Sequence, residues 1–408
     1  IMRGWRVNRL VTLEEAQRIL NAHVKQTEGT KECSLSEALG RRIGEDLAAR
    51  TDQPPFPRSP LDGYAVRAGD IRGACAQNPA VLNVAGELPA GVPAVQSLGP
   101  GQAVRIMTGA PIPEGADAVI RQEDTDYGEE KVQIYRSVKP CENICFQGED
   151  YRAGTHVIRN GERMDAVNIA LAAGMGYERV RVKKKPAVAV LTTGGELQEP
   201  GRPLRPGAVY DSNRYLVEAR LREWGITPFY AGRIEDDAGK AAGCLTRISK
   251  EADLIITTGG VSVGKMDIMH DVIERLGAER LFWRVKLKPG SPAMASVYEG
   301  AVIISLSGNP FGAAAGMELL VRPALYHMTG DSALAPVRQQ AVMENGFPKK
   351  SGSRRFVRAV SASGMVRVPE GSHSSGALSS MKGCNCLIDI PAGNEGLCKG
   401  DSVWIILL

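Results

Sequence analysis

The chain has 408 residues, of which 43% are hydrophobic and 24% charged, and its formal net charge is +4. This length predicts roughly two to four domains of an ordinary globular protein. The weak net charge argues against a nucleic-acid-binding protein, and the lack of an apolar run of about 18 residues argues against a membrane protein.

At the N-terminus no apolar stretch is long enough for a signal peptide, so we expect a cytoplasmic protein. Thr12 and Glu15 can form a capping box, and the apolar residues that follow recur at helical spacing, which predicts a helix. Residues 146–185 contain a second apolar helical stretch. We expect them to rejoin residues 1–50 and form a mixed N-terminal domain.

Residues 51–145 differ in composition from the segments around them, with frequent glycine and proline and short apolar runs. This pattern predicts a β-rich domain inserted into the N-terminal one. Asp62 and Thr108 lie in its irregular segments. Polar residues on stiff turns can belong to a site, but Asp-Gly is also an ordinary turn, and the residues alone do not decide.

Residues 186–330 alternate apolar strands with amphipathic helices. Such alternation predicts a parallel sheet with helices on both faces, that is, a three-layer α/β domain. The expected strands are 187–191, 227–231, 253–256 and 302–306, and the expected helices are 211–224, 238–250, 268–276 and 311–328. Residues 331–408 lose the helical period and contain four strand-like runs, which predict a small β-barrel or sandwich.

Three strands of the α/β domain end in glycine-rich turns. In an open parallel sheet these turns meet at the carboxyl ends of the strands, where ligands bind. Glycine lets successive backbone N–H groups face one point, which suits phosphate or another oxyanion. One such turn could equally serve only as a tight connection, but three in one sheet favour a site. The nucleotide-binding fingerprints of P-loop and dinucleotide-binding proteins are absent.

Carboxylates accompany the same turns, with Glu196 beside the first, Asp236 and Asp237 before a helix, and Asp267 near the second. Acids beside a phosphate cradle repel the ligand unless a cation intervenes, and Mg²⁺ held by one or two carboxylates would resolve the conflict. For Asp236, helix capping is an equal alternative. Arg284 and Lys288 could hold anionic groups, although lysine at a strand end is more often simply solvated.

Eight segments recur together in this order: residues 59–65, 106–117, 122–125, 148–150, 210–214, 259–264, 288–290 and 308–310. Jointly they resemble the molybdopterin molybdenumtransferase family, which is of the MoeA type in bacteria and forms the E domain of gephyrin in animals. The resemblance extends from about residue 10 to residue 400. It implies a four-domain subunit that dimerises through its N-terminal domain, with an active site between the two subunits.

The resemblance also implies a reaction. Adenylylated molybdopterin and molybdate react with Mg²⁺ present, AMP is released, and molybdenum is inserted at the dithiolene. Tungstate in place of molybdate stays open because the two oxyanions are alike in size and charge. Two alternatives also stay open, namely a molybdopterin adenylyltransferase and a non-catalytic molybdopterin-binding scaffold.

Matched by position, the family's catalytic residues fall on Asp62, Thr108, Glu196, Asp236 and Asp267, of which Glu196, Asp236 and Asp267 would hold the metal. With the glycine-rich turns, the expected substrate-binding residues are Asp150, Gly194, Gly259, Gly260, Ser262, Gly264, Arg284, Lys288, Gly308, Asn309, Pro310 and Ser372.

In these assignments Asp62 and Thr108 approach from the other subunit, Lys288 holds phosphate and Ser372 closes the cleft. Two departures from the family pattern lie inside the expected site. Gly195 stands where aspartate is usual, and Ser291 stands where lysine is common. Both departures leave the metal geometry open.

Overall fold

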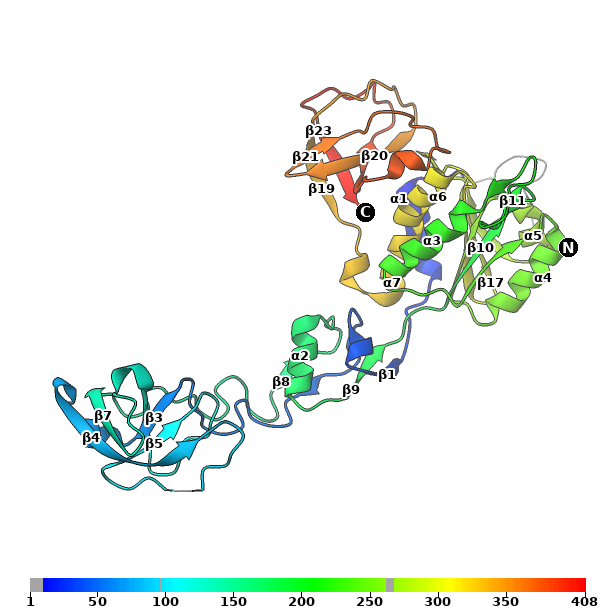
Figure 1. The fold of residues 1–408 in the computed structure, drawn as a ribbon. Coiled ribbons are helices and arrows are strands. Elements are labelled where there is room, and N and C mark those ends of the chain that lie inside the picture. The colour runs from blue at the N-terminus through cyan, green and yellow to red at the C-terminus, as the bar shows by residue number, and fades with distance from the viewer. Residues whose placement is uncertain (1–9, 96, 262–267) are drawn as a thin grey trace. The chain divides into compact units, whose positions relative to one another are not determined.

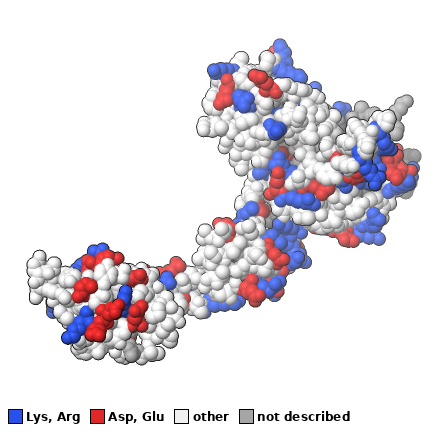
Figure 2. All heavy atoms as spheres, viewed as in Figure 1, with Lys and Arg blue, Asp and Glu red and all other residues white. Residues whose placement is uncertain are grey.

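The computed structural model describes residues 10–95, 97–261 and 268–408. The chain forms two compact units, one made of residues Ile1–Gly29 with Lys184–Leu408 and the other of Thr30–Lys183 (Figure 1). Among the described residues no helix has the length and apolar character needed to cross a membrane. On the face drawn in Figure 2, acidic and basic side chains are interspersed.

A six-stranded sheet organises the first unit, in the order β13-β10-β14-β18-β17-β15. Strands β13, β10, β14 and β18 are parallel, whereas β17 runs antiparallel to both of its neighbours. The bounds are β10 (Val188–Thr193), β13 (Tyr230–Ile234), β14 (Leu254–Thr258), β15 (Glu279–Trp283), β17 (Met294–Tyr298) and β18 (Ala301–Leu306).

The sheet is therefore mixed at one edge, which corrects the purely parallel sheet predicted from the sequence. The reason is a two-residue turn between β17 and β18. Its central residues, Glu299 and Gly300, have φ angles of 49° and 87°, and two positive φ angles give the turn that matches the twist of antiparallel strands.

Helices cover both faces of this sheet, so the predicted three-layer α/β domain is confirmed (Figure 1). Val188 and Val190 of β10 lie in a core shared with α3 and α6, while the alternate residues Ala189 and Leu191 lie in a core shared with α4 and α5. The bounds are α3 (Ser212–Glu223), α4 (Ala238–Ser249), α5 (Met269–Leu276), α6 (Pro310–Gly316) and α7 (Arg322–Thr329).

The N-terminal helix α1 (Leu13–His23) begins as its capping box predicts. The Thr12 hydroxyl accepts from the Glu15 amide at 3.2 Å, and the Glu15 carboxylate accepts from the Thr12 amide at 2.9 Å. Leu13 and Leu20 are buried in the same core as β10 and α3. The helix therefore packs on the α/β domain.

The expected helix 311–328 is interrupted by a π-helical turn, η4 (Met317–Val321). Glu318 in this turn and Arg322 after it are only 3% and 7% exposed. Burial raises the pKa of Glu318, while the guanidinium groups of Arg220 and Arg322 act in the opposite direction. Arg322 Nη1 donates to Glu318 Oε2 at 3.1 Å, so the buried charges are paired.

Arg322 also reaches the C-terminal domain. Its Nε donates to the Leu334 carbonyl at 3.2 Å, Nη1 to the Leu407 carbonyl at 2.9 Å and Nη2 to the Ala335 carbonyl at 3.4 Å. One guanidinium thus holds the segment that leaves the α/β domain and the last strand of the chain.

Five strands of the C-terminal region close into a barrel, in the order β20-β21-β19-β23-β22 with β22 returning to β20. This confirms the predicted barrel and excludes the sandwich. A short strand of the α/β domain, β16, pairs in parallel with β20. The bounds are β16 (Leu287–Lys288), β19 (Arg338–Met343), β20 (Arg354–Ala362), β21 (Met365–Arg367), β22 (Cys386–Ile390) and β23 (Ser402–Leu407).

The second unit contains a five-stranded sheet in the order β6-β3-β5-β4-β7, as the β-rich pattern predicts. In chain order this sheet lies between the two partners of each of two strand pairs, β1–β9 and β2–β8. The bounds are β1 (Thr30–Ser34), β2 (Leu47–Ala48), β3 (Gly63–Val66), β4 (Cys75–Leu88), β5 (Gln102–Ile106), β6 (Ala118–Arg121), β7 (Lys131–Arg136), β8 (His156–Ile158), α2 (Ala166–Gly174) and β9 (Arg179–Lys183).

Candidate active site

The turns after β10, β14 and β18 surround one cavity of about 390 Å³. We call it the glycine-loop cavity. Parallel neighbours bring the carboxyl ends of these strands to one edge, as expected for ligand sites in open α/β sheets. The predicted residues that line it are Gly194, Glu196, Asp236, Gly259, Gly260, Gly308 and Asn309.

Glycine is required at position 259 for a steric reason. Its φ is 89°, and a Cβ there would lie 2.4 Å from the Thr193 carbonyl oxygen. Gly308 approaches the same turn closely, since a Cβ at 308 would lie 3.4 Å from the Gly259 Cα. The turns therefore pack backbone against backbone, which a side chain at position 259 would prevent.

The two acids before α4 have different roles. Asp237 caps the helix, because its Oδ1 accepts from the Lys240 amide at 2.7 Å. Asp236 lines the cavity instead, and its carboxylate accepts from the Gly195 amide at 2.5 Å. A Cβ at 195 would lie 3.1 Å from Asp236 Oδ2, so the unusual glycine lets the carboxylate meet the backbone. The alternative of capping is thus excluded for Asp236.

Asn213 is a site residue that the sequence-based assignment omitted, although segment 210–214 was one of the matching motifs. It is 8% exposed and lines the glycine-loop cavity. Its Nδ2 donates to the Gly308 carbonyl at 2.7 Å, while its buried Oδ1 has no partner. Asn213 therefore fixes the third turn and keeps one acceptor free.

The structure describes two of the three predicted metal ligands. Glu196 and Asp236 line the same cavity, whereas Asp267 lies outside the described residues, as do Ser262 and Gly264. In the part of the chain that the structure describes, no three histidine, cysteine or carboxylate side chains are grouped so that they could hold a metal ion. Two carboxylates beside a phosphate cradle nonetheless fit Mg²⁺, which is commonly held by one or two carboxylates and by substrate phosphate.

A second cavity of about 470 Å³ lies beyond the first residues of α6. We call it the cationic cavity, because Lys288, Lys349 and Arg355 line it and no carboxylate does so among the described residues. Ser374 and Ser375 also line it. The Phe311 amide donates to the Ser375 carbonyl at 2.9 Å, which joins its wall to the helix that starts at the glycine-loop cavity.

Arg358 lies behind this wall and was not predicted. It is 1% exposed, and its Nη2 donates to the Ser372 and Ser374 carbonyls at 2.7 and 3.2 Å. Its Nε and Nη1 have no partner, and it lies 4.2 Å from the centre of the Phe311 ring. Burial lowers the pKa of Arg358, and burial followed by this guanidinium lowers the pKa of His373.

The available signal for Arg358 was an arginine inside an apolar strand pattern, at residues 356–360. A buried cation without a carboxylate is costly and often marks a place where an anion binds. Ser372 acts through its carbonyl, while its neighbours His373, Ser374 and Ser375 line the cavity.

Three further assigned residues of the first unit, Pro310, Arg284 and Lys288, do not line the glycine-loop cavity. Pro310 is the first residue of α6. Arg284 lines a third cavity, and Lys288 lies between that cavity and the cationic one. Ser291, the second departure from the family pattern, donates from its hydroxyl to the Val285 carbonyl at 2.9 Å.

In the second unit the structure brings Asp62 and Thr108 together. The Thr108 amide and hydroxyl donate to Asp62 Oδ1 at 2.7 and 2.8 Å. These two bonds, the amide first, hold the pKa of Asp62 below its ordinary value. Asp150 is exposed, and its amide donates to the Gln53 carbonyl at 2.9 Å.

Comparison with known proteins covers nearly the whole chain. Three family models match in order: MoeA N-terminal region (domain I and II) over residues 11–176, Probable molybdopterin binding domain over 189–327, and MoeA C-terminal region (domain IV) over 340–408.

The molybdopterin molybdenumtransferases of Bacillus subtilis and Staphylococcus epidermidis are 37% and 36% identical to this chain. The matches cover 98% and 97% of the chain and 94% and 95% of the relatives.

Solved structures agree. A molybdopterin biosynthesis MoeA protein from Pyrococcus horikosii superposes with a TM-score of 0.82 at 30% identity, covering 98% of this chain and 99% of that one. A second structure, from Pyrococcus horikoshii OT3, gives a TM-score of 0.80 at 32% identity, covering 98% and 100%. The chain therefore belongs to the MoeA, or molybdopterin molybdenumtransferase, family of molybdenum cofactor biosynthesis.

Proposed function

We propose that the protein inserts molybdenum from molybdate into adenylylated molybdopterin, with release of AMP. The observation that carries this proposal is the pairing of two neighbouring cavities with opposite chemistry. One offers glycine-rich turns and two carboxylates, and the other offers three cations and serine hydroxyls. A phosphoanhydride and an oxyanion are the two anionic groups that the reaction must bring together.

In the glycine-loop cavity, the turns at Gly259 and Gly308 let backbone amides approach the phosphates of the substrate. Glu196 and Asp236 would hold Mg²⁺ there, and Mg²⁺ would offset the phosphate charge as the phosphoanhydride is cleaved. Asn213 orients the third turn. The chain thus contributes mainly positioning and electrostatic stabilisation.

Molybdate fits the cationic cavity by charge. Lys288, Lys349 and Arg355 surround it, and the buried cation of Arg358 adds positive potential from behind. Neutral His373 can donate one N–H without adding charge. A dianion held there would lie in the cavity lined by Phe311, which follows Asn309 of the other cavity by two residues.

We also propose that the chain forms a homodimer, in which the partner subunit's Asp62 completes the site. The support is the Asp62–Thr108 pair, which is held by two hydrogen bonds, with Thr108 exposed and Asp62 half-buried. A monomeric mass in solution at micromolar concentration would contradict this part of the proposal.

The test uses purified protein, adenylylated molybdopterin, Mg²⁺ and molybdate. We expect AMP release that depends on molybdate, and tungstate in parallel shows whether the oxyanion is selected. AMP release that does not depend on molybdate would contradict the insertion reaction. Adenylylation of molybdopterin with ATP would instead support the adenylyltransferase, and binding without turnover would support a scaffold.

A further inference from the structure

A third cavity of about 730 Å³ lies where helix α1, segment 284–291 and the barrel meet. We call it the α1 cavity. Its lining includes Thr12 and Glu14 at the start of α1, and Arg338 and Asp389 on the barrel. Neither the glycine turns nor the serines of the cationic cavity line it.

Segment 284–288 turns one charged face toward this cavity. Arg284, Lys286 and Lys288 are exposed, while Val285 and Leu287 between them are 0% and 4% exposed. All three cations line the α1 cavity, so the segment presents them there although it is not a regular strand: Arg284 has a φ of 70°, and the Leu287 amide donates to the Val285 carbonyl at 2.8 Å. In the described part of the chain none of the three has a carboxylate within 4.0 Å.

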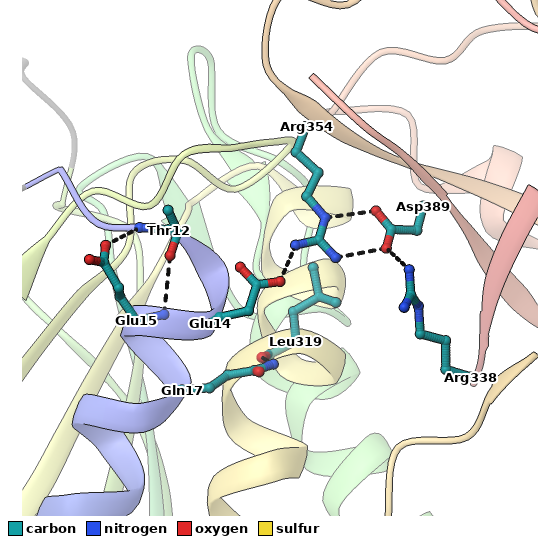
Figure 3. A network of polar contacts seen from close by, with 8 residues as sticks. All are labelled: Thr12, Glu14, Glu15, Gln17, Leu319, Arg338, Arg354 and Asp389. Atoms are coloured by element: carbon teal, nitrogen blue, oxygen red, sulfur yellow. Dashed lines mark hydrogen bonds and ion pairs between the residues drawn. The ribbon is translucent and has the colours of Figure 1, made fainter. Parts of the chain in front are cut away.

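The carboxylates of the cavity are already engaged. Asp389 accepts from Arg354 Nε and Nη2, each at 2.7 Å, and from Arg338 Nη2 at 3.2 Å (Figure 3). Glu14 accepts from the same Arg354 side chain (Figure 3). The bond to Asp389 raises the pKa of Arg354, as expected for a well-paired guanidinium.

The lining of the α1 cavity carries an excess of positive charge. The lining has five cationic side chains (Arg284, Lys286, Lys288, Arg338 and Arg354) and two carboxylates (Glu14 and Asp389), a net charge of +3. The framework is also fixed, because Arg354 pairs with Asp389 inside the barrel and with Glu14 of α1. A preformed cationic hollow loses little order on binding an anion.

The backbone around the cavity argues for a small molecule and against a peptide strand. Segment 284–288 is already paired on both sides, with Val11 bridging Val285 and Leu287 pairing with Arg354. These pairings occupy backbone groups of the segment that an added strand would need. The volume lies within the range of roughly 300–1,000 Å³ that small-molecule sites occupy.

We propose that the α1 cavity binds a small polyanion, of the di- or triphosphate class, through Lys286 and Arg284 on the α/β side and Arg338 on the barrel side. Lys288 is shared with the cationic cavity, whereas Lys286 and Arg338 line the α1 cavity and not the cationic one. The ligand bridges the α/β domain and the barrel. This site is separate from the one proposed to hold molybdate.

The test is calorimetric titration of the full chain with tripolyphosphate in Mg²⁺-free buffer. We expect a saturable site, and Lys286→Gln and Arg338→Gln should each weaken binding about tenfold, the size of one charge-assisted bond. Lys349→Gln is the matched control, because Lys349 lines the cationic cavity and not the α1 cavity. That variant should keep the affinity of the parent protein.

Three results would overturn the proposal: no saturable binding, unchanged affinity in Lys286→Gln, or a larger loss in Lys349→Gln than in Lys286→Gln. The last result would place the anion in the cationic cavity. Molybdate-dependent AMP release by Lys286→Gln, measured in the same preparation, should match the parent and shows that the variant is folded. A failure of the insertion reaction in all proteins, with tripolyphosphate binding intact, concerns the proposed function alone.

Discussion

The glycine-loop cavity and the cationic cavity lie on either side of the start of α6, yet they handle anions in opposite ways. Among the described residues the first is lined by no lysine or arginine and by two carboxylates, and the second by three cations and no carboxylate. Under the proposed function, the first would need a bound cation to accept phosphate, while the second would hold an oxyanion directly. Dependence on Mg²⁺ should separate the two.

The largest effect is expected for Glu196→Gln. Removing one of two carboxylates weakens Mg²⁺ binding, so AMP release should fall at least about a hundredfold. Part of the loss should be recovered at high Mg²⁺. Asp237→Asn is the matched control, because asparagine can still cap α4 and the residue does not line the cavity. Equal losses in both variants would contradict the division of roles.

A large effect on the fold itself is expected for Gly259→Ala. The added Cβ meets a carbonyl oxygen at 2.4 Å in a turn with φ of 89°, so we expect a loss of about 2–4 kcal/mol in the free energy of unfolding. Gly277→Ala provides the comparison, since φ is 63° there and nothing lies within 4 Å. That variant should lose only about 1 kcal/mol. Chemical denaturation measures both.

Arg358→Met should keep or increase the stability of the fold but weaken the binding of molybdate. Replacing a buried, partly unpartnered cation with an apolar side chain should leave stability equal or raise it. The concentration of molybdate needed for half-maximal AMP release should rise roughly tenfold, while the requirement for Mg²⁺ should stay unchanged. An unchanged molybdate requirement would remove Arg358 from the oxyanion site.

The smallest effect concerns the second unit and Thr108→Val. Loss of the hydroxyl leaves only the amide bond, so the pKa of Asp62 should rise toward its ordinary value. A depressed carboxyl pKa stabilises the fold above the ordinary pKa, and this contribution disappears as pH falls through the folded pKa, below about pH 4. NMR titration of Asp62 should show the change in pKa, and the small loss of stability should be present at neutral pH and disappear below about pH 4. Thr108→Ser should behave as the parent.

Much of the fold could be predicted from the sequence because single features decided it. The capping box of Thr12, the cap at Asp211 and the apolar runs before the glycine turns correspond to α1, α3 and the parallel strands. The antiparallel β17 was missed because Glu299 and Gly300 do not form a strong turn signal. The π-helical turn in the last long helix leaves no mark in the apolar pattern.

The candidate site shows the same limit. Glu196 and Asp236 follow strands that must meet at one edge, so their proximity could be predicted. Arg358 could not, because its place behind the cationic cavity depends on how the barrel packs against α6. Likewise Arg284 and Lys286 reach a cavity that exists only where α1 meets the barrel.

The contacts of Arg322 have a consequence for how the first unit comes apart. Its planar guanidinium donates to carbonyls of the connecting segment and of β23 while it neutralises Glu318 below. Pulling the barrel away would break these bonds and expose to water the apolar core that Phe356, Leu387 and Ile406 of the barrel share with the α/β domain. The α/β domain and the barrel should therefore melt as a single cooperative block, with one calorimetric peak for both.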